Sequence, residues 1–207
     1  MNRLQQSLLR ADDVLSAVLH SLGSIWPGRL GTEGTNLGDV WRHPGIKRDD
    51  ITDSLVPFHK LSQWLTCSLL EPLRSIGVHV DALEALTGLA EYRSGGLLID
   101  MGLVVSRDAS VLRIKHQPQN TCIVEWRALT VALLDEFADG VRTKLSLDAH
   151  ALPLASVLEG GTWDAGRAIA QRLRGGLPPL QIESDGTVFS AIERDIKRSS
   201  TACLNSL

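Results

Sequence analysis

The segment from Leu55 to Pro72 constrains the fold most, because it joins the apolar spacing of a buried helix to polar side chains that such a helix does not need. Helical positions three and four apart share a face. The predicted apolar stripe consists of Phe58, Leu61, Leu65, Leu69 and Leu73. The polar line consists of His59, Lys60, Gln63, Thr66 and Cys67. The pattern alone leaves open whether this line faces solvent or a binding cavity.

Proline and glycine residues set the expected ends of this helix. Pro57 suits a first helical turn, where its missing N–H costs nothing. Pro72 and Gly77 are expected to end the element.

Helical spacing recurs along the chain, so we expect a mainly α protein with a few short strands. Residues 3–22 predict an amphipathic helix, and residues 80–86 a short one. Residues 123–142 are apolar nearly all round until Asp135, which is typical of a central helix. The run 97–105 is a buried strand or a helix, because its length does not decide.

The C-terminal third predicts two further features. Gly160 and Gly161 indicate a break between two helices, with Thr162 capping the second. Such a Gly-Gly turn can also hold an anion with backbone N–H groups. Alternating apolar residues around Asp185 predict a small β-hairpin. We expect one helical domain over residues 1–192 and a frayed tail over residues 193–207.

Composition excludes several classes of protein. A net charge of −3 over 207 residues argues against a nucleic-acid scaffold, which is normally basic. No run approaches the ~18 apolar residues of a membrane span, and no secretory signal layout begins the chain. Three cysteines without a close pair fit free thiols in a reducing cytoplasm. The six scattered histidines give no metal-ligand spacing, so we expect neither a metal nor a cofactor.

Two charged residues lie in the first turns of the predicted central helix. Glu125 and Arg127 either sit at an exposed helix end or belong to a buried polar cluster of catalytic type. A buried charge needs a partner, because an isolated ion is costly to desolvate. The sequence leaves these alternatives open.

Four motifs in order resemble one family: LVPFHKLSQWLTCSLLEP, LTGLAEYRSGGLLID, IVEWRALTVALLDEFA, and PLASVLEGGTWDAGR followed by PPLQIESDGTVF. They are similar to the uracil-catabolism protein four family of fungi and bacteria, long catalogued as a domain of unknown function. The resemblance spans roughly residues 37–189 and corresponds to the C-terminal half of longer proteins. It implies uracil catabolism, and also a missing N-terminal half or a homo-oligomer as possible partners.

A more distant resemblance suggests a chemistry. Queuosine-salvage nucleotide N-glycosylases carry an aromatic-lysine motif, an acidic-tyrosine-arginine motif and a glutamate-x-arginine-alanine helix. The strings that resemble them here are Phe58-His59-Lys60 with Gln63, Glu91-Tyr92-Arg93, and Glu125-Trp126-Arg127-Ala128. The resemblance implies a helical fold of the helix-hairpin-helix N-glycosylase type. It also implies that Lys60 and Glu91 line a nucleotide pocket.

Cleavage of an N-glycosidic bond needs a carboxylate near the sugar cation and an acid for the leaving nitrogen. Glu91 is the first candidate for the carboxylate, Glu159 is the second, and His59 is a candidate acid. The candidate substrate-binding residues are Lys60, Gln63, Tyr92, Arg93, Glu125, Arg127 and Trp163. We hypothesise an N-ribosyl hydrolase that releases urea from a ribosylurea 5′-phosphate. The alternative is a non-catalytic ligand-binding or assembly module, whose partner completes the site.

Overall fold

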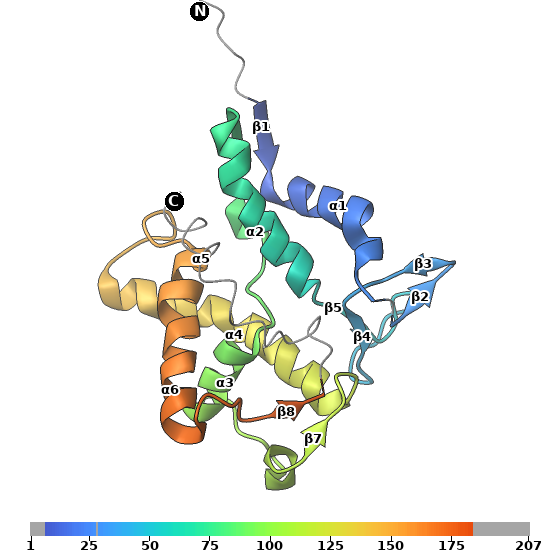
Figure 1. The fold of residues 1–207 in the computed structure, drawn as a ribbon, viewed down its shortest axis with the longest axis vertical. Coiled ribbons are helices and arrows are strands. Elements are labelled where there is room, and N and C mark those ends of the chain that lie inside the picture. The colour runs from blue at the N-terminus through green and yellow to red at the C-terminus, as the bar shows by residue number, and fades with distance from the viewer. Residues whose placement is uncertain (1–6, 28, 184–207) are drawn as a thin grey trace, which may run out of the picture.

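The helix α4 (Thr121–Leu145) is the longest described helix and crosses the middle of the molecule (Figure 1). The computed structural model describes residues 7–27 and 29–183. Within these ranges the fold is mainly α with a few short strands, as the sequence predicts. Buried side chains on the first turns of α4, Ile123, Val124 and Trp126, form the centre of the core. The prediction of a central helix is therefore confirmed.

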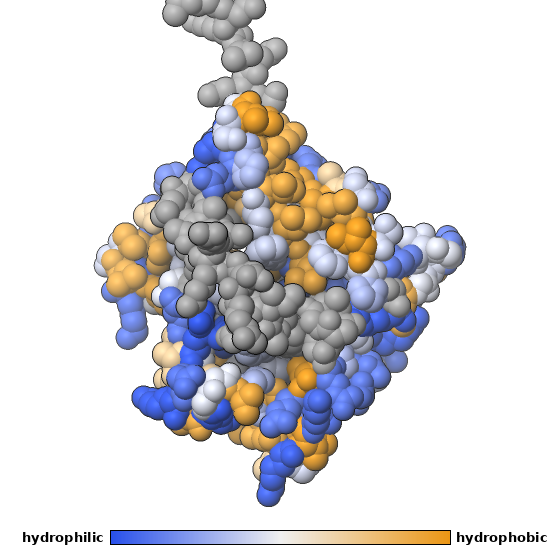
Figure 2. Space-filling model, in the orientation of Figure 1, coloured by the Kyte–Doolittle hydropathy of each residue, from blue (hydrophilic) through white to orange (hydrophobic). Residues whose placement is uncertain are grey.

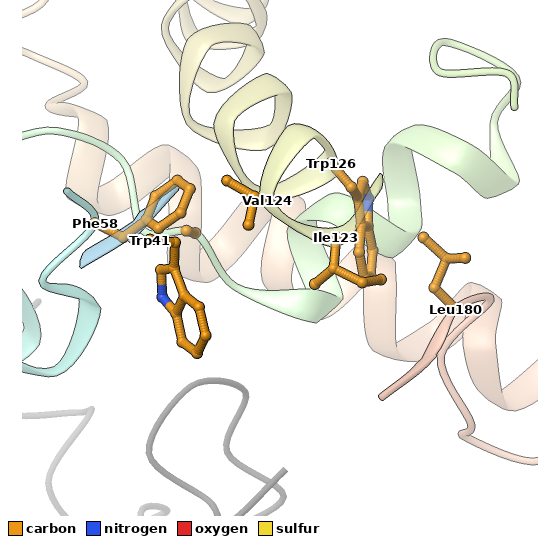
Figure 3. Packing of buried hydrophobic residues seen from close by; sticks show 7 residues of the cluster. Trp41, Phe58, Ile123, Val124, Trp126 and Leu180 are labelled. Atoms are coloured by element: carbon orange, nitrogen blue, oxygen red, sulfur yellow. The ribbon is translucent and has the colours of Figure 1, made fainter. Parts of the chain in front are cut away.

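Side chains from three other regions complete this core (Figure 3). Trp41 comes from β4 (Val40–Arg42), and Phe58 follows β5 (Leu55–Pro57), which pairs antiparallel with β4. Leu180 precedes β8 (Gln181–Ile182), which pairs in parallel with β7 (Lys115–His116). Ala90 packs on the same cluster. The long loop between α1 and α2 is thus anchored on α4 by a tryptophan.

One helix packs against α4 and also against a further helix. The helix α3 (Tyr92–Asp100) contacts α4 on one side and α6 (Asp164–Arg174) on the other. Its buried residues include Gly95 and Gly96, which allow the close approach of neighbouring elements. The open choice for the run 97–105 is therefore settled as helix up to Asp100.

The predicted helix over residues 3–22 is wrong in its first part. Residues Ser7–Arg10 form the strand β1, and only Ala11–Leu22 forms the helix α1. Strand β1 pairs in parallel with β6 (Val78–Asp81), which also replaces the first residues of the helix predicted over residues 80–86. A 3₁₀ turn, η2 (Leu83–Ala85), is all that remains of that helix. Pairing between segments about seventy residues apart overrides local spacing here.

The helix over Leu55–Pro72 is displaced along the chain. Leu55–Pro57 forms β5, so Pro57 does not begin a helix, and α2 runs from Lys60 to Ser75. Pro72 lies inside α2 and does not end it. Gly77, with a positive φ of 85°, follows its end as predicted. Backbone pairing with β4 holds the segment before Phe58 extended.

The Gly160-Gly161 break is also wrong. The short helix α5 (Leu154–Val157) continues through a π-helical turn, η4 (Leu158–Trp163), directly into α6. Thr162 is not a cap, because its buried hydroxyl group donates to the carbonyl oxygen of Leu158 at 3.2 Å. With no turn there, α6 presents no open N-terminus for an anion.

Other short elements complete the described fold. They are the 3₁₀ turns η1 (Gly23–Ile25) and η3 (Ala109–Leu112) and the antiparallel pair β2 (Gly31–Thr32) and β3 (Thr35–Asn36). The hairpin predicted around Asp185 lies outside the described residues. Among the described helices, none combines the length and apolar character that a membrane crossing requires.

The contact between α3 and α6 gives the first testable prediction. A methyl group added at Gly166 on α6 would lie 2.3 Å from the carbonyl oxygen of Arg93, a backbone atom that cannot move aside alone. We expect Gly166→Ala to lower the free energy of unfolding by about 1–3 kcal/mol, measured by urea denaturation. Gly160→Ala is the matched control, because nothing lies within 4 Å of an added methyl group there. Equal stability of both variants would contradict the close packing of α3 on α6.

Candidate active site

The buried face of α2 is its polar line, not its leucine stripe. Lys60, Ser62, Gln63 and Thr66 are buried, whereas the leucines of the predicted stripe are only half-buried. The polar line therefore faces the protein interior. A polar line turned to solvent is therefore excluded, and a binding cavity at this face stays a prediction.

A buried ion pair between Asp39 and Arg127 supports the candidate site from within the protein. Arg127 is fully buried on α4, and its two terminal nitrogens donate to the Asp39 carboxylate at 2.8 and 2.7 Å. Asp39 also accepts from the indole N–H of Trp41 at 2.6 Å. The guanidinium carbon of Arg127 lies 4.0 Å from the centre of the Phe58 ring. Two planar contacts thus fix the Arg127 side chain.

Asp39 also fixes the start of α2. Its carboxylate accepts from the backbone N–H of Lys60 at 3.2 Å, and its carbonyl oxygen accepts from the N–H groups of Phe58 and His59. Burial would raise the pKa of Asp39, but hydrogen bonds and the charge of Arg127 outweigh it, so this pKa lies below its usual range. Asp39 remains a carboxylate at neutral pH.

Lys60 and Glu91 lie within electrostatic range of each other, and Lys60 also of the Asp39–Arg127 pair. Lys60 is buried, and desolvation lowers the pKa of its ammonium group, while the charge of Glu91 opposes that shift. Desolvation likewise raises the pKa of the Glu91 carboxyl group, and the charge of Lys60 is the largest opposing effect. Burial therefore disfavours the charged form of each group, and the charge of the partner favours it.

Glu91 is held in place by the start of α3. It is the N-terminal cap of that helix, and its carboxylate accepts from the backbone N–H of Arg93 at 2.8 Å. The Trp163 side chain also hydrogen bonds to this carboxylate. Glu91 keeps some exposure as a residue, although protein atoms surround its carboxyl group. A carboxylate in this position is oriented by fixed donors.

Aromatic and cationic side chains surround Glu91. The guanidinium carbon of buried Arg93 lies 5.0 Å from the Tyr92 ring centre and 5.5 Å from that of Trp163. Arg167 on α6 approaches the Trp163 ring at 5.6 Å. Burial raises the pKa of Tyr92, and nearby Arg93 opposes that shift. Such stacking restricts long side chains to defined positions.

Gln63 holds two backbone segments together. Its amide nitrogen donates to the Thr87 hydroxyl at 2.7 Å and to the Phe58 carbonyl at 3.3 Å, and its oxygen accepts from the Thr87 N–H at 3.1 Å. These bonds link α2 to the loop before α3. Gln63 positions Lys60 and Glu91 relative to each other, since each lies near one of these segments.

The structure brings together six of the ten predicted site residues: Lys60, Glu91, Tyr92, Arg93, Arg127 and Trp163. Glu125 is exposed on α4, so of the Glu125-Arg127 pair only Arg127 enters the buried cluster. Glu159 lies on η4, and its side chain is outside the description.

His59 faces a different part of the surface. It adopts a left-handed backbone conformation before α2 and lines a small hollow with Trp26, Arg29, Asp39, Leu61 and Ser62. Burial lowers its pKa, and Asp39 is the charge that opposes this shift. Its role as an acid for the leaving group stays a prediction, because no contact between His59 and Glu91 is seen among the described residues.

Two residues of the cluster, Asp39 and Arg167, are not among the predicted residues. Asp39 lies in a loop without a local pattern, and only the need of Arg127 for an acidic partner could have pointed to it. Arg167 follows Trp163 by four residues, one helical turn, which is a weak signal. Within the described ranges, no group of three or more His, Cys, Asp and Glu side chains could hold a metal ion.

Comparison with known proteins gives a consistent result. Residues 2–189 match the family described as protein of unknown function DUF1688. The chain is 46% identical over 169 residues to "Protein urg3" of Schizosaccharomyces pombe, covering 80% of this chain and 41% of that protein. It is 39% identical over 202 residues to "Uracil catabolism protein 4" of Lachancea kluyveri, covering 86% of this chain and 45% of that protein.

The chain thus spans less than half the length of these two curated relatives. No solved structure matches it significantly. The family match covers nearly all of the sequence, including every candidate site residue. This chain belongs to the DUF1688 family, and it is similar to two relatives, one of them named for uracil catabolism.

Proposed function

We propose that this chain acts in uracil catabolism as an N-ribosyl hydrolase that converts a ribosylurea 5′-phosphate into urea and ribose 5-phosphate. The observation that carries the proposal is the pairing of Glu91 with buried Lys60 beside the aromatic and cationic side chains of α3 and η4. The name of the L. kluyveri relative, "Uracil catabolism protein 4", supports the pathway.

The pair supplies both proton transfers that the reaction needs. Water forms a bond to C1 of the ribose and gives a proton to the Glu91 carboxylate, while the C1–N bond breaks and its electron pair goes to the urea nitrogen. The Lys60 ammonium group gives that nitrogen a proton. Transfer of the proton from Glu91 to Lys60 then restores both groups. Burial raises the pKa of Glu91 and lowers that of Lys60, which reduces the cost of proton uptake by Glu91 and of proton release by Lys60.

The remaining side chains hold the substrate and the pair. Tyr92 and Trp163 present half-buried rings beside Glu91, against which an uncharged sugar or urea group can pack. Asp39 and Arg127 fix the start of α2 and so the position of Lys60. Fixed partners of this kind preorganise a site before the substrate arrives.

Ligand binding tests this function directly. We expect ribose 5-phosphate to raise the melting temperature of the wild-type chain, because a ligand that binds only the native state stabilises it. Lys60→Ala should reduce the shift, because Lys60 lies beside Glu91 at the proposed sugar site, and exposed Glu125→Gln should retain it. The same measurement with UMP alone and with urea alone shows whether a pyrimidine nucleotide or the product urea binds. Equal shifts in wild type and Lys60→Ala would exclude a sugar-phosphate site at this lysine.

A second candidate function is a ligand-binding or assembly module that needs the rest of a longer polypeptide. It is favoured by the length of the relatives and by exposed apolar side chains near the N-terminal elements, including Leu8 at 61% and Ile76 at 74% exposure. Figure 2 shows hydrophobic residues gathered over β1, α1 and α2. Ribose 5-phosphate binding that occurs only in the presence of the unmatched part of the S. pombe relative would favour this function.

A further inference from the structure

The proposed mechanism gives no role to Arg167, an arginine on α6. Arg167 is half-buried and stacks on Trp163, the residue that hydrogen bonds to Glu91. Among the residues that the structure describes, Arg167 has no carboxylate within 4.0 Å. Half-buried arginines commonly bind an acidic group, since their planar fork matches carboxylates and phosphates.

The position of Arg167 relative to Glu91 suits a sugar phosphate. One edge of Trp163 hydrogen bonds to the Glu91 carboxylate, and the Arg167 guanidinium group lies 5.6 Å from the ring centre. Trp163 thus neighbours both the Glu91 carboxylate and the Arg167 guanidinium group. A ribose 5-phosphate could therefore place C1 at Glu91 and its phosphate at Arg167, with the sugar ring between them.

Two neighbours make this position favourable for an anion. Tyr92 lies within electrostatic range of Arg167, and its hydroxyl group is a hydrogen-bond donor. Arg93 stacks on the same tryptophan at 5.5 Å, which places a second positive charge there. Contact with the indole ring holds Arg167 in one orientation, so binding costs less side-chain entropy.

We propose that Arg167 binds the 5′-phosphate of the substrate, with Tyr92 as a second donor to the same group. This inference rests on the proposed function, since that function supplies the sugar between the phosphate and Glu91. It assigns the specificity for a phosphorylated substrate to α6. Lys60, which the sequence predicts as a substrate-binding residue, is thereby assigned to proton transfer beside Glu91.

Isothermal titration of the whole chain tests the assignment with three probes: ribose 5-phosphate, ribose and inorganic phosphate. We expect Arg167→Met to weaken ribose 5-phosphate binding about 10- to 100-fold, because a hydrogen-bonded charge pair is lost while the aliphatic stem remains. Arg167→Lys should retain part of the affinity, since it keeps the charge without the fork. Arg172→Met, an exposed arginine on the same helix, is the matched control and should bind as wild type. Circular dichroism melts check that each variant is folded.

The outcomes separate this inference from the proposed function. If Arg167→Met binds ribose 5-phosphate as tightly as wild type, the assignment of Arg167 is overturned and the sugar-phosphate site stands. If phosphate binds through Arg167 but ribose 5-phosphate binds no more tightly than phosphate, the assignment stands and the sugar site fails. If wild type binds neither phosphate nor ribose 5-phosphate, the assignment is overturned.

Discussion

Replacement of Arg127 by methionine is expected to lower the free energy of unfolding by about 3–5 kcal/mol, because it leaves a buried carboxylate without its cation. Arg127 is fully buried, and both of its terminal nitrogens bond to Asp39. Methionine fills a similar volume on α4, so the loss reports on charge and hydrogen bonds more than on packing. Urea denaturation of the wild-type chain and the variant gives the difference directly.

The effect should depend on pH in a defined direction. In the native chain Arg127 holds the pKa of Asp39 below its value in the unfolded chain. The pair therefore contributes stability above the unfolded pKa of about 3.9, and this is lost as pH falls through the lower native value. In Arg127→Met, only the hydrogen bonds from Trp41 and Lys60 still oppose the effect of burial, so the pKa of Asp39 should rise. The stability difference between the two proteins should consequently be largest at neutral pH and shrink below about pH 4.

A double variant separates the ion pair from other effects. Asp39→Asn combined with Arg127→Met removes both charges, while an asparagine side-chain oxygen can still accept from Trp41 or Lys60. We expect the double variant to be more stable than Arg127→Met alone. Arg10→Met removes an arginine from the exposed pair with Asp12 and should leave stability nearly unchanged. If the double variant loses as much stability as the sum of the two single ones, the charges do not interact as the distances indicate.

The parts of the fold that could be predicted are those encoded in one segment. Residues 123–142 read as a central helix because apolar side chains occur on nearly every face of the predicted helix, and α4 buries its first turns in the core. The pairing of β1 with β6 has no comparable signal, because it depends on a partner about seventy residues away. The π-helical turn at Gly160 and Gly161 could not be predicted from the sequence either, since glycine pairs normally indicate a break in a helix.

Some residues of the candidate site could also be predicted from the sequence, and others could not. Spacing along α2 identifies Lys60 and Gln63 as one polar line, but only the tertiary structure shows that this line faces inward. Resemblance to other proteins points to Glu91, and folding brings it to Lys60 from a different helix. Asp39 has no signal of its own, because its importance follows from contacts with α2 and α4. Sequence patterns therefore identify candidate side chains better than they identify the residues that position them.

Glu91→Gln is expected to lower the rate of urea release from a ribosylurea 5′-phosphate by about 10²–10⁴-fold, the usual contribution of a general base. Glutamine keeps the length of the side chain, and its oxygen can still cap α3 by accepting from the N–H of Arg93. The variant should therefore remain folded and still raise its melting temperature with ribose 5-phosphate. Binding without turnover would show that Glu91 acts on the reacting atoms and not on affinity. A variant with full activity would exclude Glu91 as the base.

A pH profile distinguishes this role from a structural one. The charge of Lys60 is the largest effect that opposes the raised pKa of Glu91, so Lys60→Met should raise this pKa further. Since the reaction needs ionised Glu91, the acid limb of any remaining activity should move to higher pH in Lys60→Met. Glu125→Gln on the exposed face of α4 should leave the limb in place. An acid limb at the same pH in Lys60→Met and wild type would mean that the two groups do not share a proton, and the paired mechanism would be wrong.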